Sequence, residues 1–392
     1  MSHGGYANRQ FVRSLLTDRH LAHCIARKTT WTFRTYKRFL IILGRVPSVQ
    51  QRASTMRFFW GWNKSGRYVA TDKTTFCSLV EKLALCTGLR VLQLFDVPEV
   101  NFDDIGKSFP SLEVLAVEYR WHRENRGWAG SLQGLCELRQ LSLINLGCRK
   151  RPQRDEDVEE DIVEMLPSSS VASLTHLQLI EVDADVTNTF AQSLDTFVNL
   201  THLSLIYITN ETVDRIVGAD FRLIDLKMKV WSGMKDQTES MRLLLSSPVL
   251  HSLQSLELSF RGDAKWFSQR TYLITTNSIA THLTSLHHLK FRMPLYLSMC
   301  RQFNQLSNLK SIVWVTPMVV DDIDGHAFDD KEKAERCFED VFTSFSDKPS
   351  VDITIEDPDY DDVYDFDPLK ESNFDGPYPE IIPIIISTGR IE

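Results

Sequence analysis

Long hydrophobic runs are missing from this chain of 392 residues. Apolar runs such as 39–43 and 384–386 fall far short of the roughly 18 to 20 residues that a membrane span requires. The first thirty residues also lack the apolar core of a secretory signal. The sequence therefore predicts a protein that does not enter a membrane.

Cysteine is sparse, odd in number and scattered along the chain. The seven residues are Cys24, Cys77, Cys86, Cys136, Cys148, Cys300 and Cys337, and no C-x-x-C pair occurs among them. This pattern excludes a disulfide framework or a zinc-finger arrangement and is typical of reduced thiols inside a cell. We expect a cytoplasmic or nuclear protein.

Motifs of catalysis are also absent. The sequence contains no G-x-S-x-G, no H-E-x-x-H, no phosphate-binding loop and no G-x-G-x-x-G after a strand. The acidic run 357–367 lacks the central glycine and the terminal glutamate of a calcium loop. We therefore expect no enzymatic activity, no cofactor and no bound metal.

What the chain does contain is a frame of six residues, with apolar side chains at its first, fourth and sixth positions, that occurs nine times. The frames span 89–94, 112–117, 138–143, 174–179, 200–205, 223–228, 253–258, 286–291 and 309–314. Such a unit cannot bury its apolar face alone and must stack on copies of itself. The pattern predicts an α/β leucine-rich-repeat solenoid, a horseshoe with a parallel sheet on the concave face.

Segments between the frames change from a period of two towards a period of 3.6. Examples are Val213/Ile216/Val217 and Ile279/Leu283. This change predicts a strand followed by a helix in each unit, with the helices on the convex face. The 36-residue step from Leu138 to Leu174 marks an insertion, in which a basic and then acidic stretch predicts an exposed loop with a short helix over 158–165.

Charge divides the chain into unlike ends. Residues 1–73 carry fourteen Lys or Arg and two acids, whereas residues 319–375 carry twenty Asp or Glu and five Lys or Arg. We predict a basic N-terminal segment over 1–55 with helices near 11–27 and 33–43, a solenoid over 56–316, a C-terminal cap over 317–355 and an acidic tail over 356–392. A degenerate strand near 56–62 and a helix over 74–85 open the solenoid, and a helix over 329–345 with a strand over 351–355 form the cap.

The repeats resemble those of fungal F-box/LRR proteins. The segment Leu203-Ser-Leu205 followed by Ile208-Thr-Asn-Glu-Thr-Val213 is similar to the L-x-L…I-T-D-x-x-L of their cysteine-containing repeats. The resemblance implies a substrate-recognition subunit that contacts the adaptor of a cullin-type ubiquitin ligase. No F-box is legible in 1–55, which is either a degenerate remnant or a helical cap, and the usual Asn or Cys three positions after the last leucine is replaced.

Side chains at the third, fifth and seventh frame positions point to the concave face, because strand side chains alternate. Ile144, Ile180 and Ile206 predict an exposed apolar strip beside a basic zone, a combination typical of a protein-binding patch, unless loops or the cap cover the isoleucines. The predicted partner-binding residues are Ile144, His176, Gln178, Ile180, His202, Ser204, Ile206, Asp225, Lys227, Lys229, Lys290 and Arg292.

Two alternatives stay open. His176, His202 and Asp225 on neighbouring strands could reach one metal ion, although Lys227 nearby would oppose a cation. The basic N-terminus, with Arg13, Lys37 and other cations among aromatic residues, could instead serve a nucleic-acid-associated or organelle-targeted protein. We favour a non-catalytic scaffold that binds a protein.

Overall fold

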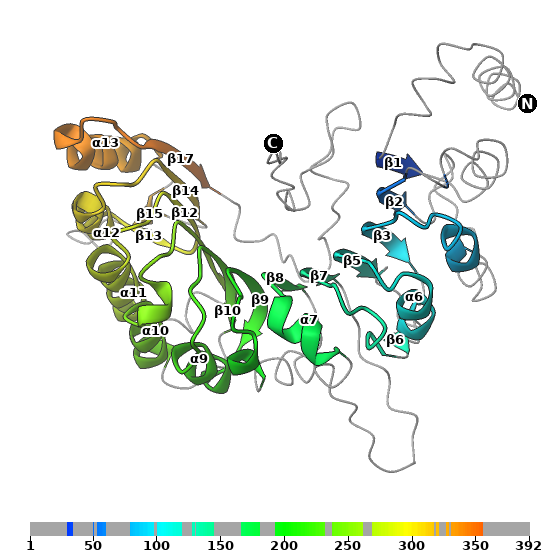
Figure 1. Cartoon of the computed structure of the whole chain (residues 1–392). Coiled ribbons are helices and arrows are strands. Elements are labelled where there is room, and N and C mark those ends of the chain that lie inside the picture. Colours follow the sequence, from blue (N-terminus) through cyan, green and yellow to red (C-terminus); the bar gives the residue numbers. More distant parts are fainter. Residues whose placement is uncertain are drawn as a thin grey trace, which may run out of the picture.

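One long parallel sheet organises the computed structural model of this chain. The structure describes residues 30–33, 50, 53–59, 79–97, 100–119, 128–129, 131–144, 166–180, 193–231, 237–261, 269–316, 319–320, 327–328 and 331–355. Within these residues the sheet curves along its length, and helices lie on its outer side (Figure 1). This architecture is the predicted α/β leucine-rich-repeat solenoid.

Twelve strands form the sheet, and every neighbouring pair is parallel. In spatial order they are β1 (Thr30–Phe33), β2 (Thr55–Phe59), β3 (Val91–Val97), β5 (Val114–Tyr119), β7 (Gln140–Ile144), β8 (His176–Ile180), β9 (His202–Ile208), β10 (Asp225–Trp231), β11 (Ser255–Arg261), β12 (His288–Arg292), β14 (Ser311–Thr316) and β17 (Ser350–Ile355). Spatial order follows chain order, as stacked repeats require.

All nine frames are strands, and each strand begins at the third position of its frame. Side chains at the first, fourth and sixth positions are at most 3 % exposed in every frame and form one continuous core. The second position adds a backbone ladder, in which Glu113 N–H donates to the Arg90 carbonyl at 2.8 Å and Arg139 N–H donates to Glu113 at 2.8 Å. Stacking therefore satisfies the backbone and buries the apolar face together.

The convex side carries helices of unequal length. They are α6 (Phe102–Ser108), α7 (Ser168–Ser173), η1 (Leu194–Thr196), α9 (Asn210–Val217), α10 (Gln237–Leu245), η2 (Pro248–Leu250), α11 (Gln269–His282), α12 (Leu297–Cys300), η4 (Arg301–Gln305), α13 (Lys331–Val341) and η5 (Phe342–Ser344). Among the described residues, short strands also pair outside the main sheet: β4 (Val100–Asn101) with β6 (Trp128–Ala129), and β13 (Leu295–Tyr296) with β15 (Val319–Val320), which in turn pairs with β16 (Ala327–Phe328).

Helix α9 shows how local sequence sets these boundaries. The Thr209 hydroxyl accepts a hydrogen bond from Thr212 N–H at 3.2 Å and forms a capping box at the first turn. Val213 and Ile216 then face the core, as their spacing predicts. The predicted strand and helix are both present in this unit and in the unit of α11. Between β8 and β9, in contrast, the described residues form only the short 3₁₀ helix η1.

The C-terminal elements agree with the sequence prediction and refine it. The expected helix is α13 followed by η5, and the expected strand is β17. Because β17 pairs with β14 over six residues, from Ser311↔Ser350 to Thr316↔Ile355, it continues the main sheet as its last strand. The expected acidic tail 356–392 lies outside the described residues.

At the other end, the sheet begins upstream of the expected boundary at residue 56. Strand β2 is the expected degenerate strand, and β1 pairs with it at Trp31↔Met56 and Phe33↔Phe58. The expected helix over 33–43 therefore cannot begin at Phe33, which is a strand residue; its remainder and the helix over 11–27 lie outside the described residues. Residues 79–83 are helical within the expected helix 74–85, and the expected loop and helix of the insertion lie outside the described part.

Other groups occupy the place of the missing Asn or Cys ladder. Val97 and Ile208, three positions after the last apolar residue of their frames, are 0 % and 3 % exposed, so they add apolar core. Near the C-terminal end, the Trp314 indole N–H donates to the Met293 carbonyl at 2.9 Å and Thr316 Oγ1 accepts from Leu295 N–H at 3.1 Å. Side chains of β14 thus satisfy backbone groups that follow β12.

Candidate partner-binding surface

The register of the sheet brings the predicted third-position residues into one row. Gln140 on β7 lies opposite His176 on β8, His176 lies opposite His202 on β9, and His202 lies opposite Asp225 on β10. The row crosses four strands at their first residues, where each side chain is half-buried. The sequence prediction that these groups are neighbours is confirmed.

His176 and His202 stack their rings face to face. The ring centroids are 3.9 Å apart and the planes differ by 12°. Each ring is held from behind by the preceding threonine: Thr175 Oγ1 lies 2.8 Å from His176 Nδ1 and Thr201 Oγ1 lies 2.9 Å from His202 Nδ1. The repeated Thr-His-Leu sequence of two successive frames is the signal for this arrangement.

The threonine contacts also fix the tautomer of both rings. Thr175 Oγ1 lies 3.1 Å from the Arg139 carbonyl, and Thr201 Oγ1 lies 3.1 Å from the Thr175 carbonyl. A carbonyl only accepts, so each hydroxyl donates to it and must accept from Nδ1–H of its histidine. Both contacts are satisfied when Nδ1 carries the proton, which leaves Nε2 of each ring as an acceptor.

Burial keeps this pair uncharged near neutral pH. The pKa of His176 falls from 6.5 to about 4, first because burial disfavours the imidazolium and second because His202 lies beside it. Burial also lowers the pKa of His202, while Asp225 opposes that shift and Lys227 adds to it. Two neutral imidazoles can stack closely, whereas two imidazolium rings would repel each other.

We predict that acid destabilises the fold through this pair. Because the folded pKa of His176 is below its unfolded value, the unfolded chain takes up a proton first, and stability that is complete above pH 6.5 is lost as the pH falls towards 4. The loss from His176 should be about 2 kcal/mol by pH 4.5, reduced by its partial exposure. Urea unfolding at pH 7 and pH 4.5 measures it.

His176→Gln should reduce the acid loss by that amount, and the exposed His251→Gln, a control with the same chemistry, should leave it unchanged. An equal acid loss in His176→Gln and the parent chain would show that the stacked pair does not carry the effect.

Metal binding by this row finds no support in its geometry. Among the described residues, no group of three or more His, Cys, Asp or Glu side chains is arranged to hold a metal ion. The stacked rings place His176 and His202 side by side rather than converging on one point.

No helix of the described residues combines the length and the apolar character that crossing a membrane requires.

The predicted exposed isoleucine strip is wrong at its first residue. Ile144 is 6 % exposed, Ile180 is half-buried, and the side chain of Ile206 lies outside the described set. Ile144 lies opposite Glu118 on β5 and shares a shallow hollow with Phe95 of β3. Ile144 is therefore a buried residue of the concave face, which the alternation of side chains along its own strand did not predict.

Gln178 and Ser204 are also buried, contrary to their prediction as surface contacts. Each is 8 % exposed, and the Ser142 hydroxyl donates to Gln178 Oε1 at 2.7 Å across β7 and β8. This hydrogen bond satisfies the Ser142 hydroxyl and Gln178 Oε1, whereas Gln178 Nε2 is buried without a hydrogen-bond partner. Buried concave-face residues run across β3 to β9, at 5–8 % exposure: Gln93, Phe95, Val114, Ala116, Ser142, Ile144, Gln178 and Ser204.

The predicted basic zone contains a carboxylate that divides it. Glu257 on β11 lies between Lys227 on β10 and Lys290 on β12 in register. Its Oε1 is 2.8 Å from Lys290 Nζ and its Oε2 is 3.8 Å from Lys227 Nζ. The two lysines are therefore partly neutralised, and sequence reasoning missed this although all three residues share the fifth frame position.

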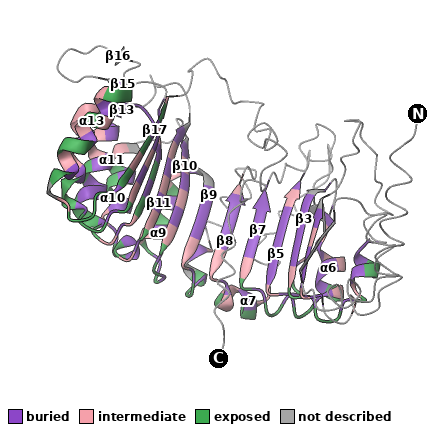
Figure 2. Ribbon diagram, turned by 90° about the horizontal axis from the view of Figure 1, so that it is seen from above, coloured by how far each residue is buried: buried purple, intermediate pink, exposed green. Residues whose placement is uncertain are grey.

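The two halves of the concave face differ in burial (Figure 2). Across β3, β5 and β7 the strands are almost wholly buried. From β10 to β12 the concave positions are half-buried or exposed: Asp225, Lys227, Lys229, Ser255, Glu257, Ser259, His288, Lys290 and Arg292. We call these nine residues the C-terminal concave surface, and it is the accessible part of the predicted site.

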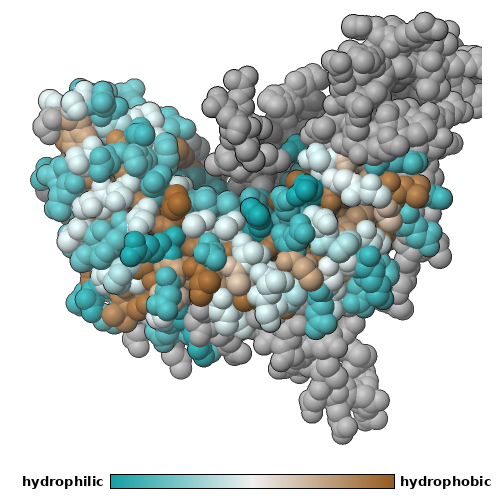
Figure 3. All heavy atoms as spheres, in the orientation of Figure 1, coloured by the Kyte–Doolittle hydropathy of each residue, from teal (hydrophilic) through white to brown (hydrophobic). Residues whose placement is uncertain are grey.

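On the side of the molecule seen in Figure 3, hydrophobic residues of the described part lie scattered among hydrophilic ones. Large exposed apolar side chains occur singly, such as Leu243 at 41 % and Val198 at 54 %. Single exposures of this kind are normal for a protein surface. The concave sheet face thus remains the candidate with a defined arrangement.

Comparisons with known proteins do not place this chain in a family. No protein-family model matches the chain. No curated protein matches it. Among solved structures, a leucine-rich-repeat protein of Leptospira interrogans is similar with 10 % identity and a TM-score of 0.28, covering 83 % of this chain and 88 % of that one. The fold assignment stands on the strand register and buried frames of this chain itself.

Proposed function

We propose that this protein is a non-catalytic scaffold that binds a protein partner on its C-terminal concave surface. The observation that carries the proposal is the change in burial along the sheet. Concave residues of β3 to β8 are largely buried, while those of β10 to β12 present polar and charged side chains to solvent at regular spacing. A curved row of such side chains offers an extended surface for a polypeptide.

The charge of this surface favours an anionic segment of the partner. It carries four cationic side chains, Lys227, Lys229, Lys290 and Arg292, against the carboxylates Asp225 and Glu257. Glu257 is already paired with two lysines, and Lys229 and Arg292 flank Ser259 on the next row. Complementary charges of this kind accelerate association and select the partner.

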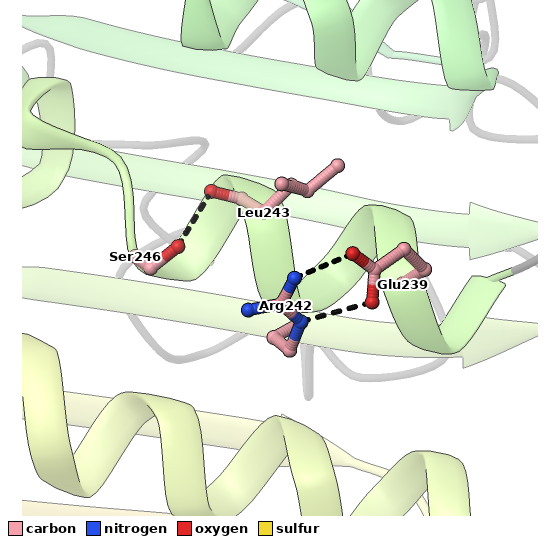
Figure 4. A network of polar contacts seen from close by, with 4 residues as sticks. All are labelled: Glu239, Arg242, Leu243 and Ser246. Carbon is pink, nitrogen blue, oxygen red and sulfur yellow. Dashed lines mark hydrogen bonds and ion pairs between the residues drawn. The ribbon is translucent and has the colours of Figure 1, made fainter.

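Charges on the convex helices are arranged differently. On α10 the Arg242 guanidinium donates to both oxygens of Glu239, at 2.9 and 2.5 Å, and the Ser246 hydroxyl donates to the Leu243 carbonyl at 3.1 Å (Figure 4). These contacts stay within one helix and raise the pKa of Arg242 through its hydrogen bonds to Glu239. These charged side chains of α10 are therefore already paired with each other.

Charge reversal at the seventh-position row tests the proposal. Lys229→Glu with Arg292→Glu should weaken partner binding roughly tenfold per charge, because attraction becomes repulsion at the contact. The matched control is Arg215→Glu with Arg222→Glu, which changes net charge equally at exposed residues of α9 and the following loop. Quantitative cross-linking to cellular proteins compares the three chains.

A protein retained by the parent and the control but lost by the concave variant supports the proposal. Equal retention by all three chains rejects it, and thermal unfolding of each variant excludes a folding defect.

The narrower role in a cullin-type ligase is a hypothesis from the family resemblance. It depends on residues 1–55, most of which lie outside the described residues. Because β1 belongs to the sheet, the informative deletion is 1–29 rather than 1–55. Capture of the ligase adaptor by the full chain and not by the deletion supports this role, and capture by neither rejects it.

A further inference from the structure

Two cysteines meet where the last helix packs on the preceding repeat. Cys300 ends α12 and is 0 % exposed, while Cys337 lies on α13 and is half-buried. The helices α12 and α13 are in contact, and the two thiols share a side-chain hydrogen bond. Both cysteines are in the free form, so two reduced thiols that are 37 positions apart in the sequence lie next to each other.

The surroundings make the two sulfurs unequal. The hydrogen bond from Cys300 lowers the pKa of Cys337 to about 7, and the charge of Arg301 helps, while burial and Asp340 oppose the shift. The Cys337 thiol donates to the Leu297 carbonyl at 3.7 Å, which places its sulfur against α12. Cys337 is therefore the nucleophilic and more accessible sulfur, and the thiolate is the reactive form.

The other described cysteines lack this combination. Cys86 is 1 % exposed, and burial raises its pKa to about 11. Cys136 is exposed, and its thiol contacts the Gln133 carbonyl at 3.9 Å. Buried isolated thiols are inert, and Cys136 makes no contact with another cysteine of the described residues that would give it a partner for a disulfide.

We propose that Cys300 and Cys337 form an oxidation site for hydrogen peroxide, at which Cys337 is the attacking sulfur and Cys300 is the resolving one. The product is a disulfide that joins α12 to α13. It ties the terminal unit, α13 with β17, to the unit before it.

The chemistry balances with one peroxide. The Cys337 thiolate attacks one peroxide oxygen, the O–O bond breaks, and the departing hydroxide takes a proton and leaves as water. Cys337 is then a sulfenic acid. The Cys300 sulfur attacks the Cys337 sulfur, the S–O bond breaks, and a second water leaves with the Cys300 proton. Two thiols are oxidised, and the peroxide is reduced to two waters.

Mapping of the oxidised full chain tests the proposal. After brief treatment with hydrogen peroxide and alkylation of the remaining thiols, peptide mass spectrometry should find Cys300 linked to Cys337, and dithiothreitol should reverse the link. In Cys300→Ser, a dimedone probe should trap the sulfenic acid at Cys337. In Cys136→Ser, the matched control, the Cys300–Cys337 link should form as in the parent.

Two further readouts come from the unmodified sequence and do not depend on how the variants fold. The rate of Cys337 oxidation should rise about tenfold between pH 6 and pH 8 and then level off, as expected for a thiol with a pKa near 7. The oxidised chain should unfold at a temperature higher by about 5 °C, because the new bond closes a long loop.

Peroxide that oxidises Cys136 before Cys337, or a chain whose Cys300 and Cys337 stay unlinked while Cys337 is oxidised further, would overturn the proposal.

Discussion

Gly134→Ala is expected to destabilise the fold by about 3 kcal/mol, because a methyl group there has no space. A Cβ on Gly134 would lie 2.5 Å from the carbonyl carbon and oxygen of Gly106 and 2.8 Å from its Cα. These are backbone atoms of a buried residue of helix α6, so they cannot rotate away. Asp103 Oδ1 accepts from Ser131 N–H at 2.8 Å and fixes the same approach.

Equilibrium urea unfolding measures the loss, and Gly218→Ala is the matched control. Gly218 ends α9 in ordinary right-handed helical geometry, and its nearest neighbour to a new Cβ is the Asp214 carbonyl oxygen at 3.3 Å. The exposed Gly218 should accept alanine within about 0.5 kcal/mol. Equal stability of the Gly134 variant and the parent would contradict the close packing of successive units at this point.

Trp314→Ala is expected to cost about 4 kcal/mol, the largest effect we anticipate for a single core side chain. Trp314 is 0 % exposed and lies at the centre of an aromatic cluster, with ring centroids 4.5 Å from Phe291, 6.2 Å from Phe303 and 6.1 Å from Phe338. Its removal leaves a cavity and also leaves the Met293 carbonyl without the indole donor. Both losses fall on the C-terminal units.

Hydrogen exchange in the native state should locate this loss. In Trp314→Ala, the amide hydrogens of β14, α13 and β17 should exchange faster, while those of β7 and β8 keep their protection. The reason is that each repeat unit is stabilised mainly by the units next to it. Trp314→Phe, which keeps most of the volume but not the N–H donor, should lose about 1–2 kcal/mol. A uniform rise in exchange along the whole sheet would contradict nearest-neighbour coupling.

The strands were predictable because their signal is local. Positions one, four and six of a frame repeat along the chain, and the burial of Leu138, Leu141 and Leu143 follows from that spacing alone. Strand β1 was missed because Thr30–Phe33 lacks the frame and pairs only through the backbone register with β2. The type of helix in each unit also depended on tertiary packing. The described residues between β8 and β9, for example, form the short 3₁₀ helix η1 and not an α-helix.

For the candidate site, the sequence predicted which residues are neighbours on the sheet but not which of them are exposed. Register placed His176, His202 and Asp225 side by side, as the frames implied. The burial of Ile144, by contrast, is set by its surroundings across several strands, because Ile144 lines one pocket with Phe95 of β3 and Glu118 of β5, and no single frame contains these residues. The Gly106–Gly134 contact is likewise set by packing between units, because it joins helix α6 to the turn before β7 through space.

Site-specific photo-cross-linking tests the central claim, partner binding on the C-terminal concave surface, most directly. A benzophenone amino acid would replace Ser259, which lies between Lys229 and Arg292, or Leu243, which is 41 % exposed on α10 of the convex side. Irradiation in cells, followed by mass spectrometry, should yield one protein cross-linked at position 259 and not at position 243. Cross-links of that protein at 243 but not at 259 would contradict the claim.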